Sequence, residues 1–169
     1  MAWERATGEA TVDGLAVLYR GCYHRYLRVA EAITGDVELA HDAVQDAFAR
    51  ALRSRSSYRG VGSVEGWVWR IVVNAARAAR GGANRGGQVP LDEAGEERFA
   101  GEGEPTADGV RAVIAGLPER QRLVLFLRYY ADLDYQRIAE ALEIRPGTVG
   151  ATLNQAQRAL RSVLEEVPT

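Results

Sequence analysis

The chain has 169 residues, 47% of them hydrophobic, and a formal net charge of −2. That length suits one ordinary domain or two small ones, and that apolar content excludes wholesale disorder. No apolar run approaches the roughly 18 residues that span a membrane, and no basic-then-apolar signal peptide opens the chain. We therefore expect a soluble, cytoplasmic protein without membrane insertion.

Metal and disulfide chemistry find little support in the sequence. Cys22 is the only cysteine, so an internal disulfide is excluded. Cys22 and His24 lie two positions apart, a spacing that points them to different faces of a helix, and His41 is distant. A structural zinc site needs four ligands. We expect neither a metal nor a cofactor.

Charge is distributed unevenly along the chain. Residues 1–80 carry a net charge of +2, residues 81–109 a net charge of −5, and residues 110–169 a net charge of +1. All 21 basic residues are arginine, which a compositional bias of the source genome explains. The middle segment is also rich in glycine at positions 81–87. We interpret 81–108 as an acidic linker between a domain at 1–80 and a domain at 109–169.

The N-terminal part has the hydrophobic periodicity of three helices. Apolar residues recur every three or four positions over 15–33, 40–52 and 64–75. Gly35 can end the first helix and Ser63 can cap the third. On the third helix we place Trp67 in the core and Trp69 off the core face.

The C-terminal part predicts four shorter helices, over 110–117, 118–130, 134–142 and 146–163. Pro118 and Pro146 can each open a helix, and Asp134 can cap one. The strand signal is poor throughout, so we predict an all-α chain of two small helical domains. The last two helices, joined by a tight turn at 143–145, have the layout of a helix-turn-helix, whose second helix can enter the DNA major groove. A plain helical hairpin is the alternative.

Four segments in this order resemble the extracytoplasmic-function (ECF) class of the sigma-70 family. Residues 36–48 (DVELAHDAVQDAF) are similar to its polymerase-binding helix in the second region, and 67–71 (WVWRI) with Asn74 to its promoter-melting helix. Residues 117–129, opening LPERQR, and 133–149, ending PGTV, are similar to its fourth region and helix-turn-helix. The resemblance covers both ends of the chain and the gap between them.

The resemblance implies a core polymerase-binding surface on the second helix. Its residues would be Asp42, Gln45, Asp46 and Phe48. The alternative is a solvated polar face beside a core phenylalanine.

The resemblance also implies a site for the minus-ten promoter element. The loop at 58–63 would capture a flipped base, with Gly60 and Gly62 allowing a close backbone approach. Arginines and one asparagine fall three or four apart on the next helix, so they line one stripe that can follow phosphates. An ordinary solvated face is the alternative. The residues expected to contact DNA are Tyr58, Arg59, Ser63, Trp69 (by stacking), Arg70, Asn74, Arg77 and Arg80.

The expected minus-thirty-five site departs from the family pattern. The candidate residues are Arg145, Gly147, Thr148, Ala151, Thr152, Asn154, Gln155 and Arg158. Only Arg145 and Arg158 are basic, whereas the family typically has several basic residues here. Amide side chains can still read adenine edges. We therefore predict a weaker and less salt-dependent grip on DNA, with loss of DNA binding as the alternative.

These patterns together predict an alternative sigma factor that binds core RNA polymerase and promoter DNA. It would be no enzyme and would take no small-molecule substrate, because nucleophile–base spacing and phosphate loops are missing from the sequence. An anti-sigma factor, common in the family, is a further candidate partner. The rival interpretations are a sigma-like decoy that binds an anti-sigma factor or polymerase without productive promoter recognition, and a dimeric repressor.

Overall fold

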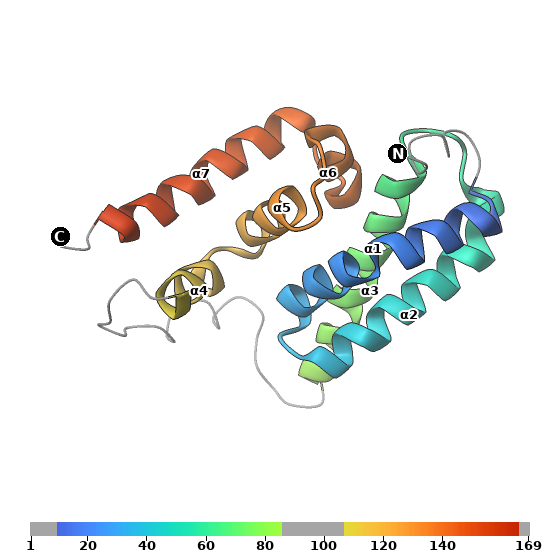
Figure 1. The fold of residues 1–169 in the computed structure, drawn as a ribbon, viewed down its shortest axis with the longest axis horizontal. Coiled ribbons are helices and arrows are strands. Elements are labelled where there is room, and N and C mark those ends of the chain that lie inside the picture. Colours follow the sequence, from blue (N-terminus) through green and yellow to red (C-terminus); the bar gives the residue numbers. More distant parts are fainter. Residues whose placement is uncertain (1–9, 86–106, 166–169) are drawn as a thin grey trace.

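The computed structural model describes residues 10–85 and 107–165, and over these ranges it consists of helices joined by turns (Figure 1). The first range holds α1 (Val12–Thr34), α2 (Val37–Ser54), the short 3-10 helix η1 (Arg55–Ser57) and α3 (Val64–Arg85). The second holds α4 (Ala107–Gly116), α5 (Glu119–Tyr129), α6 (Tyr135–Leu142) and α7 (Pro146–Glu165). The predicted all-α class is confirmed.

Local signals fix where the N-terminal helices begin and end. Thr11 caps α1 by accepting a hydrogen bond from the backbone N–H of Gly14 at 3.0 Å. Gly35 ends α1 in the left-handed conformation at φ 73°, which glycine adopts without a steric penalty. The Asp36 carboxylate then caps α2 by accepting from the N–H of Leu39 at 2.8 Å. The chain turns between α1 and α2 within two residues, so the two helices form a hairpin.

A shared core holds α1, α2 and α3 together. Tyr26 from α1 lies fully buried, its ring centroid 5.2 Å from Phe48 of α2 and 4.3 Å from Trp69 of α3. Val44 and Val72 are also fully buried beside them. Large apolar groups from all three helices therefore leave water together, which is the main favourable term in forming this bundle.

The C-terminal helices pack around α5. Leu123 and Leu127 of α5 are fully buried, as are Ile138 of α6 and Val149 of α7. The predicted starts of the last helices are confirmed: α7 opens at Pro146, and the Asp134 carboxylate caps α6. Pro118 stands one position before α5 rather than inside it.

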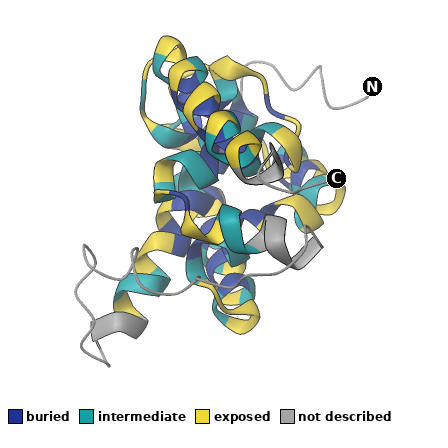
Figure 2. Cartoon of the chain, turned by 90° about the vertical axis from the view of Figure 1, so that its left-hand side faces the viewer, coloured by how far each residue is buried: buried dark blue, intermediate teal, exposed yellow. Residues whose placement is uncertain are grey.

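The two helical groups contact each other, chiefly through α3 with α6 and through α1 with α5. In Figure 1 the N-terminal bundle lies beside the C-terminal helices, with α6 next to the upper part of α3. Figure 2 shows buried residues inside both groups and exposed residues along their outer faces. The Arg25 guanidinium of α1 donates to the carbonyl oxygen of Ala131, after α5, at 3.3 Å.

The helix α3 is longer than the sequence predicts. We expected it to end before the linker at position 81, but it continues through Gly81 and Gly82 to Arg85. Glycine lowers helix stability without forbidding the helix, so a helix already held by its packed first half can extend through these positions. The rest of the predicted acidic linker lies outside the described residues. Within 10–85 and 107–165, no helix is long and apolar enough to cross a membrane.

Candidate nucleic-acid interface

One side of α3 carries the predicted row of polar and basic side chains. Ser63 stands at its start, where its hydroxyl oxygen caps the helix by accepting from the N–H of Gly66 at 2.9 Å. Arg70, Arg77 and Arg80 follow at helical spacing, half-buried or exposed, and Asn74 lies exposed between them. The spacing places these groups on one face, as the sequence predicts. We call Ser63, Arg70, Asn74, Arg77 and Arg80 the α3 row.

The loop before α3 is closed by its own hydrogen bond. The Tyr58 hydroxyl donates to the carbonyl oxygen of Gly62 at 2.8 Å, which ties the two ends of the loop together. Gly60 and Gly62 have φ values of 69° and 77°, a conformation that other residues rarely adopt. Arg59 is exposed within the loop. The two glycines are therefore needed for the turn itself, in addition to any close approach by a base.

The two tryptophans of α3 have exchanged their expected places. Trp69 is completely buried in the three-helix core, so its expected stacking on a DNA base is wrong. Trp67 is only partly buried, with its ring centroid 5.5 Å from that of Tyr58. The buried face of α3 runs through positions 68, 69, 72, 73 and 76 and is thus rotated from the predicted face. Trp67 is the aromatic ring that lies against the loop.

The predicted helix-turn-helix is present as α6, a tight turn and α7. Asp134 accepts a hydrogen bond from the N–H of Arg137 at 2.8 Å and so fixes the start of α6. Glu143 adopts the left-handed conformation at φ 55°, which ends α6 and reverses the chain. The Arg145 carbonyl oxygen then accepts from the N–H of Thr148 at 2.9 Å as α7 begins. The turn is set by the backbone at the positions that the sequence indicates.

The outer face of α7 is polar but carries little charge. The expected DNA-contacting residues that are exposed here are Arg145, Gly147, Ala151, Asn154, Gln155 and Arg158, and Thr148 is half-buried. Thr152, by contrast, is only 6% exposed, so the expectation that it contacts DNA is wrong. It shares the core-facing side of α7 with Val149, Leu153 and Ala156, three or four positions away.

The predicted polymerase-binding residues on α2 divide into two kinds. Asp42 and Gln45 are exposed, and Asp46 is half-buried and paired with Arg50 at 2.6 Å. Phe48 is only 6% exposed, because its ring packs edge-on against Tyr19 at 4.8 Å between centroids. Phe48 is therefore a core residue, as the alternative has it, whereas Asp42 and Gln45 project into solvent where a partner can reach them.

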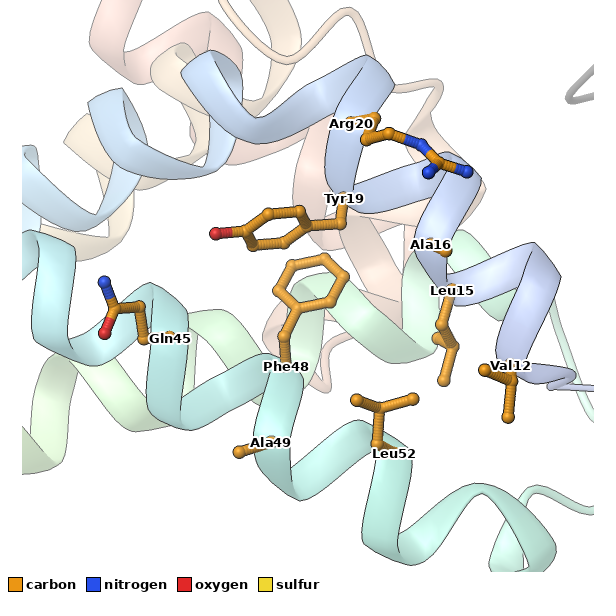
Figure 3. A pocket seen from close by; sticks show the side chains of 9 residues that line it. All are labelled: Val12, Leu15, Ala16, Tyr19, Arg20, Gln45, Phe48, Ala49 and Leu52. Atoms are coloured by element: carbon orange, nitrogen blue, oxygen red, sulfur yellow. The ribbon is translucent and has the colours of Figure 1, made fainter.

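An apolar groove lies next to these residues, and sequence reasoning missed it. It encloses about 450 Å³ between α1 and α2. Figure 3 shows the rings of Tyr19 and Phe48 side by side, with Val12, Leu15 and Leu52 along one end. Val12 and Leu52 are exposed large apolar residues at the ends of their helices. Periodicity alone counts such residues as core, so it hides a groove of this kind.

Acidic side chains from the C-terminal helices meet the α3 row. The Glu140 carboxylate of α6 accepts hydrogen bonds from the Ser63 backbone N–H at 3.1 Å and from its hydroxyl at 3.0 Å. The Glu119 carboxylate of α5 pairs with Arg77 at 2.7 Å and with Arg80 at 3.6 Å. Sequence reasoning missed these contacts, because each acid sits on the polar face of its own short helix.

Two further ion pairs join the halves beside this row. Arg70 of the row lies 3.6 Å from the Glu143 carboxylate, and Glu65 of α3 lies 3.3 Å from Arg137 of α6. Burial raises the pKa of the Glu65 carboxyl, and the lowering effect of Arg137 and Arg25 offsets only part of this. The protonated form of the Glu65 carboxyl is therefore more favoured in the folded chain than it would be in water.

The described part of the chain contains no candidate metal site. Residues 10–85 and 107–165 contain no cluster of three or more histidine, cysteine or carboxylate side chains. Cys22 is half-buried and is not part of a disulfide.

Comparisons with known proteins match both halves of the chain. The family profile described as Sigma-70 region 2 matches residues 18–85, and that described as Sigma-70, region 4 matches residues 108–160. The ECF RNA polymerase sigma-E factor of Escherichia coli K12 is 31% identical over 144 residues, which cover 75% of this chain and 73% of that protein. The RNA polymerase sigma-H factor of Pseudomonas aeruginosa is 29% identical over 159 residues, covering 84% of this chain and 81% of the relative.

A solved structure shares the fold of both halves. The sigma factor RpoE of Bartonella quintana, determined in complex with the anti-sigma factor NepR, superposes with a TM-score of 0.68 at 18% identity. The match covers 92% of this chain and 99% of that one.

Proposed function

This chain belongs to the extracytoplasmic-function group of the sigma-70 family, and we propose that it binds core RNA polymerase through α2 and reads promoter DNA through α3 and α7. It is an alternative sigma factor, and members of this family direct transcription initiation and are not enzymes. The synthesis of RNA is left to the polymerase. We place its action in the cytoplasm, where the polymerase and the chromosome lie.

The α3 row and the loop before it are the proposed minus-ten site. Three arginines at helical spacing can each donate to phosphate oxygens of one strand, and Asn74 between them can reach a base edge. Arg59 and the glycine turn of the loop offer exposed polar groups and open backbone to an unstacked base. Trp67, beside Tyr58, replaces Trp69 as the proposed aromatic contact.

The proposed minus-thirty-five site is the N-terminal part of α7. Asn154 and Gln155 are exposed and can donate to and accept from an adenine in the major groove, and Ala151 can touch a thymine methyl group. Only Arg145 and Arg158 remain to contact phosphates. Each phosphate contact adds about 0.9 to the slope of affinity against salt, so binding here should depend weakly on salt.

The proposed polymerase-binding surface combines polar and apolar parts. Asp42 and Gln45 project from α2, and the groove beside Phe48 can accept apolar side chains of a partner helix. An interface with a buried apolar centre and a polar rim is the common form of stable protein contacts.

One observation favours a second candidate function. Because α7 carries so little charge, a sigma-like decoy that binds polymerase or an anti-sigma factor without reading promoters is the alternative. The relative from Bartonella quintana was solved with an anti-sigma factor, which makes that class of partner the first to test here.

The match of both family profiles in the correct order carries the sigma-factor proposal. Run-off transcription tests it directly: the protein is added to core polymerase from the source organism over a library of upstream fragments, with core polymerase alone as the control. New start sites that share two spaced motifs would support promoter recognition. Tight binding to core polymerase without transcripts would support the decoy, and failure to bind core polymerase would refute the sigma-factor proposal.

A further inference from the structure

We propose that the cavity between the C-terminal half of α1 and the helices α4 and α5 binds a small phosphorylated ligand with a planar ring, the chemistry of a nucleotide. The ligand would be bound and not converted. Of the residues that line this cavity, the proposed function uses Arg80 alone. The inference can therefore hold or fail independently of promoter recognition.

The cavity lies where the two halves of the chain meet. It encloses about 690 Å³, and its walls come from the C-terminal half of α1, from Arg80 of α3 and from α4 and α5. In Figure 1 the end of α1 lies on the side of the N-terminal bundle that faces these two helices. The volume falls within the range of roughly 300–1,000 Å³ that is usual for small-ligand pockets.

Positive charge predominates among the side chains that line the cavity. Arg28, Arg80 and Arg122 line it from three different helices, and among the described residues a single carboxylate, that of Glu31, does so. Glu31 lies 3.4 Å from Arg28, and Arg80 lies 3.6 Å from the Glu119 carboxylate. No carboxylate within 10–85 and 107–165 forms an ion pair with Arg122. An anion in the cavity would supply the negative charge that its lining lacks.

The surroundings of Arg122 favour an anionic partner. Its Nη1 donates to the carbonyl oxygens of Ala115 at 2.9 Å and Leu117 at 3.4 Å, which holds the side chain in place. Its Nε is buried without a hydrogen-bond partner among the described residues. Burial, and then the charge of Arg80, lower the pKa of the Arg122 guanidinium, and Glu119 offsets only part of this. A phosphate group near both guanidiniums would offset their mutual repulsion and accept charge-assisted hydrogen bonds.

An aromatic pair lines the same cavity. The rings of Phe126 and Tyr130 stack at 5.1 Å between centroids, with 17° between their planes. Tyr130 is 58% exposed, which leaves part of its ring available to a ligand. Aromatic rings bind planar groups by stacking, and arginine forks bind phosphate oxygens. The two features in one cavity match a nucleotide better than a simple anion.

The test measures binding to the full chain, without polymerase or DNA, by isothermal titration calorimetry. The probes are ADP, GDP, pyrophosphate and adenosine. We expect at least one of the two nucleotides to bind with a Kd below about 1 mM and more tightly than pyrophosphate, which lacks the ring, or adenosine, which lacks phosphate. Absence of binding by both nucleotides up to about 1 mM would overturn the proposal. Pyrophosphate binding as tightly as the nucleotides would overturn the assignment of a planar ring.

Four substitutions in the lining locate the bound nucleotide. Arg28→Gln and Arg122→Gln should each weaken its binding on the order of tenfold, because a charge-assisted hydrogen bond to phosphate is lost. Arg28 is exposed, so its variant tests the site even if Arg122→Gln disturbs the fold. Tyr130→Ala should weaken binding of the nucleotide and spare pyrophosphate. Glu31→Gln should tighten binding, because a carboxylate that repels phosphate is removed.

Three matched variants change side chains outside the cavity. They are Arg53→Gln on α2, Tyr129→Ala beside the aromatic pair, and Arg77→Gln, an arginine of the α3 row that does not line the cavity. All three should bind the nucleotide as wild type does. A loss in Arg77→Gln as large as that in Arg28→Gln would place the nucleotide on the proposed DNA site and overturn the proposal. Unchanged binding in both Arg28→Gln and Tyr130→Ala would also overturn it.

Run-off transcription keeps this result apart from the proposed function. Transcripts from wild type, together with no nucleotide binding to the isolated chain, would reject the cavity as a ligand site and keep the sigma-factor role. Nucleotide binding that is lost in Arg28→Gln, together with no transcripts from wild type, would keep the ligand site and reject promoter recognition.

Discussion

Single residues on α3 and α7 show where helical spacing predicts a contact and where it misleads. The arginine stripe was predicted because every third or fourth residue shares a face whatever the helix packs against. Trp67 and Trp69 were misassigned because both flank the apolar stripe, and only the surrounding core decides which ring is buried. Trp69 meets Tyr26 of α1, a contact 43 positions away that no local pattern encodes.

Trp69→Ala should destabilise the fold by about 3–5 kcal/mol, the usual cost of removing a fully buried large aromatic ring. Urea unfolding measures this free energy. Trp67→Ala, which removes a partly exposed ring, is the matched control and should cost clearly less. If Trp69→Ala were as stable as wild type and defective only in DNA binding, Trp69 would have the role of stacking on a DNA base after all.

Asn154→Ala should weaken selective promoter binding by about 1–3 kcal/mol, because an exposed amide that reads a base edge is lost. Transcription from matched promoters that differ in one minus-thirty-five base pair measures the change. Thr152→Val, at the buried neighbouring face, should leave selectivity intact. Loss of selectivity in Thr152→Val with none in Asn154→Ala would show that α7 presents another face to DNA.

At the scale of helices, start and stop signals were the most reliable guide. Gly35, Ser63, Asp134 and Pro146 all act where the sequence places them, because caps depend on neighbouring backbone groups alone. The end of α3 was predicted too early, at the glycine-rich segment. Glycine weakens a helix by about 1 kcal/mol, which a long helix anchored at its other end can tolerate.

Asp36→Ala should lower the free energy of unfolding by about 1 kcal/mol through loss of the α2 cap. Thermal or urea unfolding detects it, with Glu38→Gln in the same first turn as a control that leaves the cap intact. Because the substitution lies outside the proposed polymerase surface, core polymerase should bind the folded variant normally. Unchanged stability would mean that water replaces the cap at no cost.

At the scale of the whole molecule, the sequence predicts two helical groups but says nothing of how they meet. Glu119 and Glu140 look like ordinary solvent-facing acids within their own helices, and their partners lie 42 and 77 positions away. Long-range pairing of surface charges leaves no periodic mark. The sequence shows glycines at 62 and 66, but it does not show that the Glu140 side chain fills the space beside them.

Glu65, at the junction of the halves, should give stability a specific pH dependence. Its pKa in the folded chain is raised, so its contribution is fully present below the unfolded value near 4.5 and is lost as pH rises through the folded pKa. The stability of wild type relative to Glu65→Gln should therefore fall as pH rises from about 4.5 toward neutral. Urea unfolding across this range measures it, with Glu38→Gln as an exposed control.

A relative stability that rises with pH would instead mean that the pairing of Glu65 with Arg137 outweighs the cost of burying the carboxylate.

The contact of α3 with α6 of the same chain also has a consequence for dilution. A contact between two molecules forms more often as their number rises, whereas a contact within one chain keeps the same effective concentration at every dilution. The hydrogen bonds of Glu140 with Ser63 and the ion pairs of Glu119 with Arg77 and Arg80 should therefore be as populated in a dilute solution as in a concentrated one.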